Sequence, residues 1–284
     1  LSPNFSGRRI WAQLRLRETK TESALSAKSK KEARMSSTLR YLHHPASQPC
    51  RAVQQFLLEI EVPFEEEIID IMSGINELQD FKDSHNPTGQ VPILIDGDFT
   101  VWESAAIAFY LNEKFNAPSN WFGANAEQRA RIQQYLHWHS TTLRRGAGAF
   151  FYSNFAECIW GKRDYSKEIE KGHMVLRESM GILEGWLSKT EYVCGDEISF
   201  ADLQGVHEFV SHKAGRVISD SQWAEFPNVK RWFDMLTARP HAKTVSATII
   251  EVGKIRARGE LIPMTRKTSL AKGTEVVGSG TLGI

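Results

Sequence analysis

Several features that define common protein classes are missing from this chain of 284 residues. Its three cysteines, an odd number with no secretory signal, do not suggest a disulfide framework and fit a reducing compartment. The cysteine and histidine spacings typical of zinc sites are absent, so no metal is expected. No apolar run approaches the ~20 residues that span a bilayer. With a formal net charge of only +1, nothing suggests nucleic acid as a partner.

Positive charge is concentrated at the start of the chain. Residues 1–34 hold nine Lys or Arg against three Glu, so the remainder is mildly acidic. Lacking apolar periodicity, residues 1–35 are predicted to form a disordered basic tail. It is either an extension, for instance translated sequence upstream of Met35, or an organellar transit peptide. The three glutamates argue against a transit peptide, because such peptides are poor in acidic residues. We expect a cytoplasmic protein, with organellar targeting by the tail as the alternative.

Residues 36–118 alternate between strand and helix patterns. Pro49 is tolerated in the first turn of a helix, and Cys50, Val53 and Leu57 follow at helical spacing. Asp96-Gly97-Asp98 is typical of a hairpin turn. One mixed sheet with helices on both faces fits this order. The expected segments are strand 39–43, helix 49–60, strand 64–71, a short helix up to 81, strands 91–95 and 99–102, and helix 103–115 with Ala106, Phe109 and Tyr110 as its apolar face.

The second half is predicted to be helical. The helical domain is predicted over residues 119–257. It begins with a linker, 118–124, and continues as a bundle of roughly five or six helices. Two apolar stripes have helical spacing, and no strand pairs are evident. Residues 258–284, rich in Gly, Thr and Ser towards the end, are predicted to form a flexible tail. The stripes are Leu176, Met180, Leu183 and Leu187, and Val229, Trp232, Phe233 and Leu236.

Several motifs, in order, resemble the theta/delta branch of the glutathione S-transferases. Residues 44–53 read H-P-A-S-Q-P-C-R-A-V, residues 86–94 read N-P-T-G-Q-V-P-I-L, and residues 103–107 read E-S-A-A-I. Residues 141–145, T-T-L-R-R, and 199–203, S-F-A-D-L, also match. The resemblance runs from about Thr38 to about Val252. It implies an N-terminal thioredoxin-like domain with a mixed four-stranded sheet, a C-terminal helical bundle, glutathione as cosubstrate, and a homodimer.

Ser47 is the expected catalytic residue. A thiol with a pKa of about 8.5 is mostly protonated at neutral pH, whereas the thiolate is the nucleophile. A hydroxyl that donates a hydrogen bond to sulfur favours the anion, and the helix start near Pro49 adds partial positive charge. A serine is too weak a base to take the thiol proton, so its role must be that of donor. The competing interpretation is that Ser47 only caps the helix.

The resemblance assigns further residues to glutathione. A cis peptide before Pro92 would turn the backbone of Val91 outwards to pair with the cysteinyl part of glutathione, as an added strand does. Glu103 and Ser104, at a helix start, suit the ammonium and carboxylate of its γ-glutamyl end. Asn76 and Gln90 stand where relatives have cations for the glycyl carboxylate, and this departure would weaken binding.

Other assignments and alternatives stay open. His44, Arg144 and Arg145 are candidates for the electrophile pocket, although a solvated helix face explains the arginines equally well. Cys50 lies in the first turn of a helix, where the pKa of a thiol can fall, so a thiol-transferase mechanism is an alternative. The simpler interpretation is that Cys50 is a small buried residue. A non-catalytic interaction module is the rival class, and a halide, epoxide or hydroperoxide is the expected electrophile. The pair Ser199 and Asp202 reads as a structural capping box.

Overall fold

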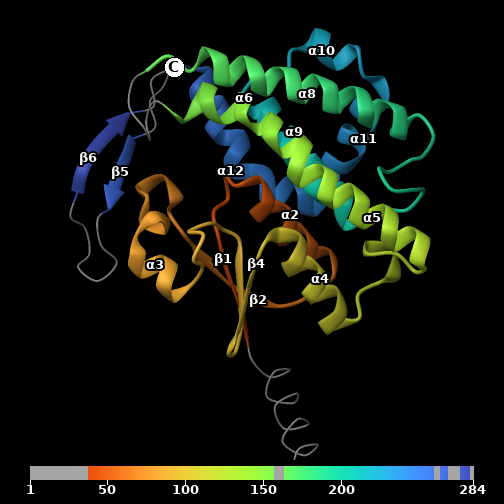
Figure 1. Ribbon diagram of the computed structural model, residues 1–284, viewed down its shortest axis with the longest axis horizontal. Helices are drawn as coiled ribbons and strands as arrows, with labels where there is room; N and C mark the ends of the chain where they lie inside the picture. The colour runs from red at the N-terminus through yellow and green to blue at the C-terminus, as the bar shows by residue number, and fades with distance from the viewer. Residues whose placement is uncertain (1–37, 157–162, 259–262, 268–275, 282–284) are drawn as a thin grey trace, which may run out of the picture.

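A computed structural model describes residues 38–156, 163–258, 263–267 and 276–281. The basic tail expected over residues 1–35 therefore lies outside the described residues. Two parts pack together, a sheet with flanking helices and a larger group of helices (Figure 1). None of the helices in the described segments combines the length and apolar character needed to cross a bilayer.

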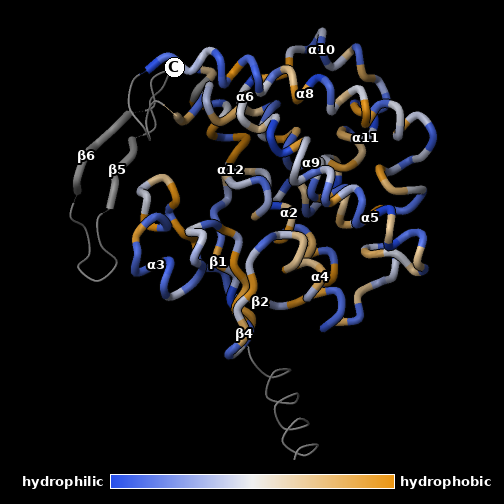
Figure 2. The backbone as a smooth tube through the Cα atoms, viewed as in Figure 1, coloured by the Kyte–Doolittle hydropathy of each residue, from blue (hydrophilic) through white to orange (hydrophobic). Residues whose placement is uncertain are grey.

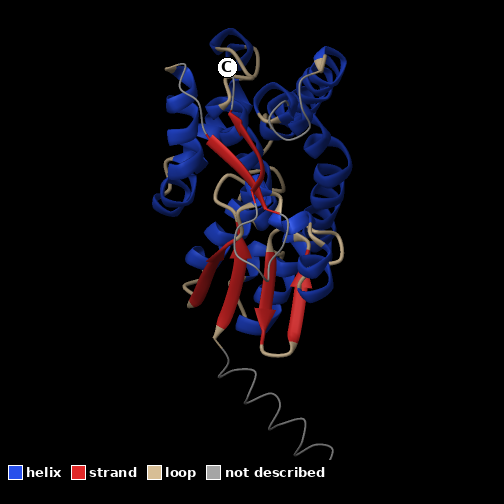
Figure 3. Ribbon diagram, turned by 90° about the vertical axis from the view of Figure 1, so that its left-hand side faces the viewer, coloured by secondary structure: helices blue, strands red, loops and turns tan. Residues whose placement is uncertain are grey.

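The first part contains a four-stranded mixed sheet with strand order β2-β1-β3-β4 (Figure 3). Strand β1 pairs parallel with β2 and antiparallel with β3, and β3 pairs antiparallel with β4. This confirms the thioredoxin-like prediction. The elements are β1 (Leu39–His43), α2 (Gln48–Glu59), β2 (Phe64–Ile68), η1 (Ile71–Ser73), η2 (Ile75–Glu77), α3 (Gln79–Ser84), β3 (Ile93–Asp96), β4 (Phe99–Trp102) and α4 (Ser104–Phe115).

Side chains that alternate along the strands separate the two faces of this sheet. Tyr41 and Leu94 pack on the α2 and α4 side, whereas Leu42 and Ile93 pack with Phe81 of α3 on the other. In Figure 2 hydrophobic segments lie along the strands, and the outer turns of α3 and α5 are mainly hydrophilic. Helices therefore cover both faces, as the order of elements predicted.

Local details differ from the sequence predictions. The second strand ends at Ile68 rather than 71, and Asp70 accepts a hydrogen bond from the backbone N–H of Ser73 in the following turn. Strand β3 begins at Ile93, after Pro92, which has no N–H for the ladder. The apolar face predicted for α4 was wrong: Phe109 is exposed, and the buried residues include Ile107. Tertiary contacts, not hydropathy alone, selected that face.

The second part comprises α5 (Ala126–Trp138), α6 (Arg144–Asn154), α8 (Ser166–Leu187), α9 (Phe200–Ala214), α10 (Asp220–Ala224), α11 (Pro227–Thr237) and α12 (Pro240–Ala257). These seven α-helices in the described residues exceed the five or six expected, partly because α10 is very short. Both predicted apolar stripes, on α8 and α11, are buried. Helix α9 runs through the centre, buried from Phe200 to His212. Its start carries the predicted capping box of Ser199 and Asp202.

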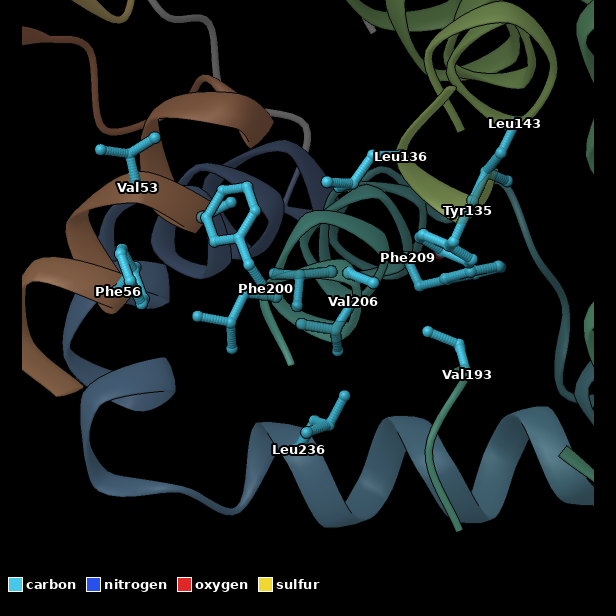
Figure 4. Packing of buried hydrophobic residues seen from close by; sticks show 14 of the residues in the cluster. Val53, Phe56, Tyr135, Leu136, Leu143, Val193, Phe200, Val206, Phe209 and Leu236 are labelled. Atoms are coloured by element: carbon cyan, nitrogen blue, oxygen red, sulfur yellow. The ribbon is translucent and has the colours of Figure 1, made fainter. Parts of the chain in front are cut away.

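One hydrophobic core joins the two parts. Figure 4 shows Val53 and Phe56 of α2 beside Phe200 and Val206 of α9. The boundary expected near 118 falls between α4 and η3 (Ser119–Trp121), but the linker that follows is not simply exposed. Trp121 is only 4% exposed, and its ring meets that of Phe56 edge to face. Aromatic residues in this segment therefore fix the two parts against each other.

Within residues 258–284, where the sequence predicts a flexible tail, the structure describes two short strands. Strands β5 (Pro263–Lys267) and β6 (Val276–Thr281) pair antiparallel as a separate two-stranded sheet. Val276 and Val277 are β-branched, which favours a strand even beside several glycines.

Candidate functional site

A cleft of about 920 Å³ lies between the two parts of the molecule. The N-terminus of α2, the loop before β3 and the start of α4 form one wall. Helices α5 and α9 and the turn between α5 and α6 form the other. Of the site residues expected from the sequence, the structure brings Ser47, Asn76, Gln90, Val91, Pro92, Glu103, Ser104 and Arg144 to this cleft.

Two expected residues do not line the cleft, His44 and Arg145. The ring of His44 accepts a hydrogen bond from the backbone N–H of Ala46 at 3.2 Å. Burial lowers the pKa of His44 to about 4, so the ring is neutral at pH 7. Arg145 is exposed on α6. Neither residue is therefore placed to contact an electrophile bound in the cleft.

Ser47 stands at the N-cap position of α2, but its side chain makes no capping hydrogen bond. The turn before it is closed by the backbone N–H of Ser47, which donates to the carbonyl of His44 at 2.9 Å. The helix has proline in its first turn, which leaves one fewer N–H group to cap. The Ser47 hydroxyl thus borders the cleft without a capping role, next to the positive end of a 12-residue helix.

Cys50 is fully buried, at 0% exposure, and does not line the cleft. Burial raises the pKa of its thiol to about 11, and the nearby Ser47 hydroxyl offsets this only in part. Its backbone carbonyl accepts a hydrogen bond from the Tyr41 hydroxyl at 2.6 Å. A thiol that is protonated at neutral pH and closed to solvent is a poor nucleophile, which argues against the Cys50 mechanism.

The peptide bond between Val91 and Pro92 is cis, as the resemblance implied. The ladder between β1 and β3 begins at Ile93, opposite Leu42. Val91 therefore precedes the paired residues, and it lines the cleft. An extended peptide can pair with a residue in this position by backbone hydrogen bonds.

Two asparagines shape the loop before Val91. Asn76 donates from Nδ2 to the carbonyl of Gly89 at 2.7 Å, and the buried Asn86 donates from Nδ2 to the carbonyl of Gln90 at 2.8 Å. The Oδ1 atom of Asn86 also accepts from the backbone N–H of Thr88 at 3.0 Å. Gly89 has a φ of 66°, and a Cβ there would lie 2.5 Å from the carbonyl oxygen of Asn76. Asn76 thus holds the loop, a role that the sequence did not reveal.

Glu103 has backbone angles that non-glycine residues rarely adopt, φ 71° and ψ 116°. Such a conformation costs about 1–3 kcal/mol and persists where the surroundings enforce it. The carboxylate is exposed at the cleft, immediately before α4. The adjacent Ser104 hydroxyl is buried and accepts a hydrogen bond from Nε2 of Gln204 at 2.8 Å, so its own proton is left to donate.

Gln204 was missed in the sequence, because the segment around it also holds Asp202, His207 and Glu208, and local hydropathy does not single it out. It lines the cleft from α9, and its Oε1 atom is buried without a hydrogen-bond partner. A buried, unsatisfied acceptor is costly.

A π-helical turn, His139–Leu143, joins α5 to α6 and sets the opposite wall. Such turns widen a helix locally and are frequent at functional sites. His139 of this turn lines the cleft, and so does Arg144, the first residue of α6. Arg144 donates to Oε1 of Glu208 at 2.8 Å, and Nε2 of His139 lies 3.5 Å from the same oxygen. Burial alone would raise the pKa of Glu208, but Arg144 and His139 lower it to about 2.

Arg51 links the loop that carries Ser47 to the second part of the molecule. Its guanidinium is fully buried and donates to the carbonyls of Pro45 at 3.1 Å and His207 at 2.9 Å, and to the Ser211 hydroxyl at 2.7 Å. Burial lowers its pKa to about 10. Arg51 is therefore a positioning residue. Among the described residues, no group of three or more His, Cys, Asp or Glu could hold a metal ion.

Comparisons with known proteins identify the family. The model of the glutathione S-transferase N-terminal domain matches residues 37–113, and that of the C-terminal domain matches residues 149–240. The chain is 55% identical over 255 residues to a dichloromethane dehalogenase of Methylorubrum extorquens, which covers 87% of this chain and 88% of that protein. The chain belongs to the glutathione S-transferase family. Cleft and sheet are thus those of a transferase, and the interaction-module alternative is not supported.

Other relatives place this transferase near the theta class. It is 52% identical over 253 residues to the dichloromethane dehalogenase of Methylophilus leisingeri, covering 88% of this chain and 95% of that protein. Human glutathione S-transferase theta-1 is 36% identical over 171 residues, 60% of this chain and 70% of the human one. A crystal structure of human glutathione transferase theta-2 with glutathione superposes with a TM-score of 0.70 at 25% identity, covering 78% of this chain and 90% of that one.

Proposed function

We propose that this transferase dehalogenates small alkyl halides with glutathione, and that the Ser47 hydroxyl stabilises the attacking thiolate. The observation that supports it most directly is that the Ser47 hydroxyl borders the cleft and makes no capping hydrogen bond. A hydrogen bond to an anion is typically worth about 1.5–3 kcal/mol. A hydrogen bond of this strength lowers the pKa of a thiol by roughly 1–2 units, which brings a thiol pKa of about 8.5 close to 7.

Glutathione would lie along the wall formed by the first part of the molecule. Its cysteinyl backbone pairs with Val91, which places the sulfur towards Ser47. At the γ-glutamyl end, Glu103 and Oε1 of Gln204 receive the ammonium group, and Ser104 donates to the carboxylate. The strained backbone of Glu103 and the unsatisfied oxygen of Gln204 support this assignment.

The glycyl carboxylate would meet Gln90 and the loop held by Asn76. Because Nδ2 of Asn76 is already bonded to Gly89, the Gln90 side chain is the better donor. A neutral amide binds a carboxylate less strongly than a cation does. We therefore expect weaker affinity for glutathione than in a variant that carries lysine at position 90.

The electrophile would occupy the far side of the cleft, near Arg144 and His139. Two relatives that match most of this chain are named dichloromethane dehalogenases, which makes dichloromethane the first halide to test. The thiolate forms a C–S bond as chloride leaves. The sulfur lone pair then expels the second chloride, water adds, and the adduct releases formaldehyde and the thiol. One dichloromethane and one water thus give one formaldehyde and two HCl, with glutathione regenerated. Arg144, held by Glu208, supplies positive charge to the departing halide.

The test measures chloride and formaldehyde with glutathione far below the dichloromethane concentration. We expect two chlorides per formaldehyde, turnover beyond the glutathione supplied, and loss of most of the rate in Ser47→Ala. Epoxides and hydroperoxides are assayed in parallel, because the family fold admits them. Turnover of either, without chloride release from any halide, would overturn the choice of substrate class.

Glutathione binding is tested separately. Glu103→Ala is expected to weaken binding by about 1.5–3 kcal/mol, or roughly tenfold to a hundredfold, as measured by calorimetry. Arg145→Ala, exposed and away from the cleft, is the matched control. An unchanged dissociation constant for Glu103→Ala would contradict the assignment of Glu103 to glutathione binding.

We also expect a homodimer, as the resemblance implies. Light scattering should then give about twice the chain mass of 32.2 kDa. A monomer at micromolar concentration would contradict this expectation.

A further inference from the structure

The loop that carries Ser47 is a four-residue turn, His44-Pro45-Ala46-Ser47, between β1 and α2. The backbone N–H of Ser47 closes it by donating to the carbonyl of His44 at 2.9 Å. Proline is favoured at the second position of such a turn, because its fixed φ already suits that position. The place of Ser47 at the cleft therefore depends on the geometry of this turn.

The side chain of His44 adds a second hydrogen bond to the turn. Its Nδ1 atom accepts from the backbone N–H of Ala46 at 3.2 Å, two residues further along the chain. Asn and Asp often make this bond at the first position of a turn, where a side-chain oxygen accepts from the backbone two residues on. In this turn the ring nitrogen of His44 takes the place of that oxygen.

The bond requires one form of the imidazole ring. A neutral histidine has one ring nitrogen that accepts and one that carries the proton, whereas a protonated histidine has two donors and no acceptor. Because Nδ1 accepts, the proton must lie on Nε2. Burial lowers the pKa of His44 to about 4, against an opposing effect of Asp70, and His43 and Arg51 lower it further. The accepting form is therefore the one present at neutral pH.

Arg51 holds the same peptide unit from its other side. Nη1 of Arg51 donates to the carbonyl of Pro45 at 3.1 Å, and two further hydrogen bonds tie the guanidinium to α9. The carbonyl of Pro45 and the N–H of Ala46 belong to one planar peptide group. Arg51 thus donates to the oxygen of this group, and His44 accepts from its nitrogen.

This peptide group is the central one of the turn. Rotating it completely would give a turn that needs a positive φ at Ala46, which alanine rarely adopts and which Ala46 does not have. The turn should therefore still form without the His44 bond. The peptide plane would be free to tilt, however, and Ser47 is the next residue along the chain.

We propose that His44 is a positioning residue for Ser47, and that it acts by holding the central peptide of the turn through Nδ1. This inference rests on the proposed role of Ser47. His44 itself does not line the cleft, so it acts through the backbone and not by touching glutathione or the halide. Small displacements of a reacting or stabilising group can slow an enzyme substantially. Without the bond, the Ser47 hydroxyl is held less precisely against the sulfur, and less of the bound thiol is ionised.

Two substitutions separate the hydrogen bond from the volume of the ring. His44→Phe keeps an aromatic ring and removes the acceptor, whereas His44→Asn removes the ring and keeps an acceptor for the N–H of Ala46. With one good halide at neutral pH, we expect His44→Phe to lower kcat about threefold to tenfold. The apparent pKa of bound glutathione should rise by about 0.5–1 unit in parallel, since the thiolate is the nucleophile. KM for glutathione, and kcat of His44→Asn, should stay within about twofold of the wild type.

A double-mutant cycle tests whether His44 acts through Ser47. In the Ser47→Ala background, His44→Phe should change kcat by less than about twofold, because the hydroxyl that His44 positions is already gone. An equal loss in both backgrounds would overturn the proposal. So would a wild-type rate in His44→Phe, or a His44→Asn variant as slow as His44→Phe.

Nitrogen-15 spectra of the histidine rings give a measurement that does not depend on activity. We expect the wild-type His44 ring to be neutral, with its proton on Nε2, between about pH 5.5 and 8. A proton on Nδ1 would overturn the proposal, even if His44→Phe failed to fold. Ser47→Ala alone distinguishes the two levels of inference. If it keeps the wild-type rate and thiol pKa, the proposed role of Ser47 is wrong and that of His44 with it; if it is impaired while His44→Phe is not, only the role of His44 is wrong.

Discussion

Replacing Ser47 by alanine separates a catalytic role from a capping role. A serine that caps a helix contributes about 1 kcal/mol of stability. The Ser47 side chain makes no capping bond, so we expect the free energy of unfolding of Ser47→Ala to stay within about 0.5 kcal/mol of the wild type. The change should act on the bound thiol instead.

The expected kinetic effect follows from the lost hydrogen bond. At about 1.5–3 kcal/mol, its removal raises the pKa of bound glutathione by roughly 1–2 units. The rate at neutral pH should then fall about tenfold or more. Because the thiolate still forms at higher pH, the pH–rate profile of Ser47→Ala should shift to the alkaline side and recover part of the activity. Glutathione affinity should change little.

The assay is the pH dependence of kcat with one good halide, together with the thiolate absorbance of bound glutathione. Cys50→Ala is the matched control, since Cys50 is buried and away from the cleft. It should lower stability through lost packing and leave conjugation nearly intact. An unshifted pKa in Ser47→Ala, with a melting temperature several degrees lower, would mean that Ser47 is only a cap. An inactive Cys50→Ala with an active Ser47→Ala would instead indicate a mixed-disulfide mechanism.

Four further predictions concern stability. Glu208→Gln should remove about 2–3 kcal/mol at pH 7, because the pKa of the carboxyl is lowered to about 2; in urea titrations the difference should shrink below pH 4.5 and vanish as pH falls through 2. Burial lowers the pKa of His212 to about 4, so only the unfolded state gains this proton between pH 6.5 and 4; His212→Leu should therefore lose less stability over that range than the wild type. Arg51→Met, which leaves three acceptors without their donor, should cost about 3 kcal/mol or more in chemical denaturation. A chain starting at Met35 should keep its melting temperature and turnover; a loss of several degrees would refute the tail boundary.

Local sequence signals predicted the helices and strands correctly where a single local pattern was clear. Hydrophobic spacing located the buried stripes of α8 and α11, and the S-F-A-D sequence located the capping box before α9. The turn Asp96-Gly97-Asp98 located the hairpin of β3 and β4. The prediction was wrong for the face of α4, since Phe109 is exposed although it is apolar. A helix that borders a cleft has apolar residues on more than one side, and hydropathy alone does not rank them.

The sequence by itself indicated which residues could bind glutathione and stabilise its thiolate. Ser47 before a helix, a proline after Val91, and Glu103-Ser104 at a helix start are local patterns, and the structure places them at one cleft. The tertiary structure alone decided how the opposite wall supports them. Gln204, Glu208 and the guanidinium contacts of Arg51 join segments more than 60 residues apart. A buried polar side chain is defined by its partner, and that partner is supplied by packing between helices that no local pattern encodes.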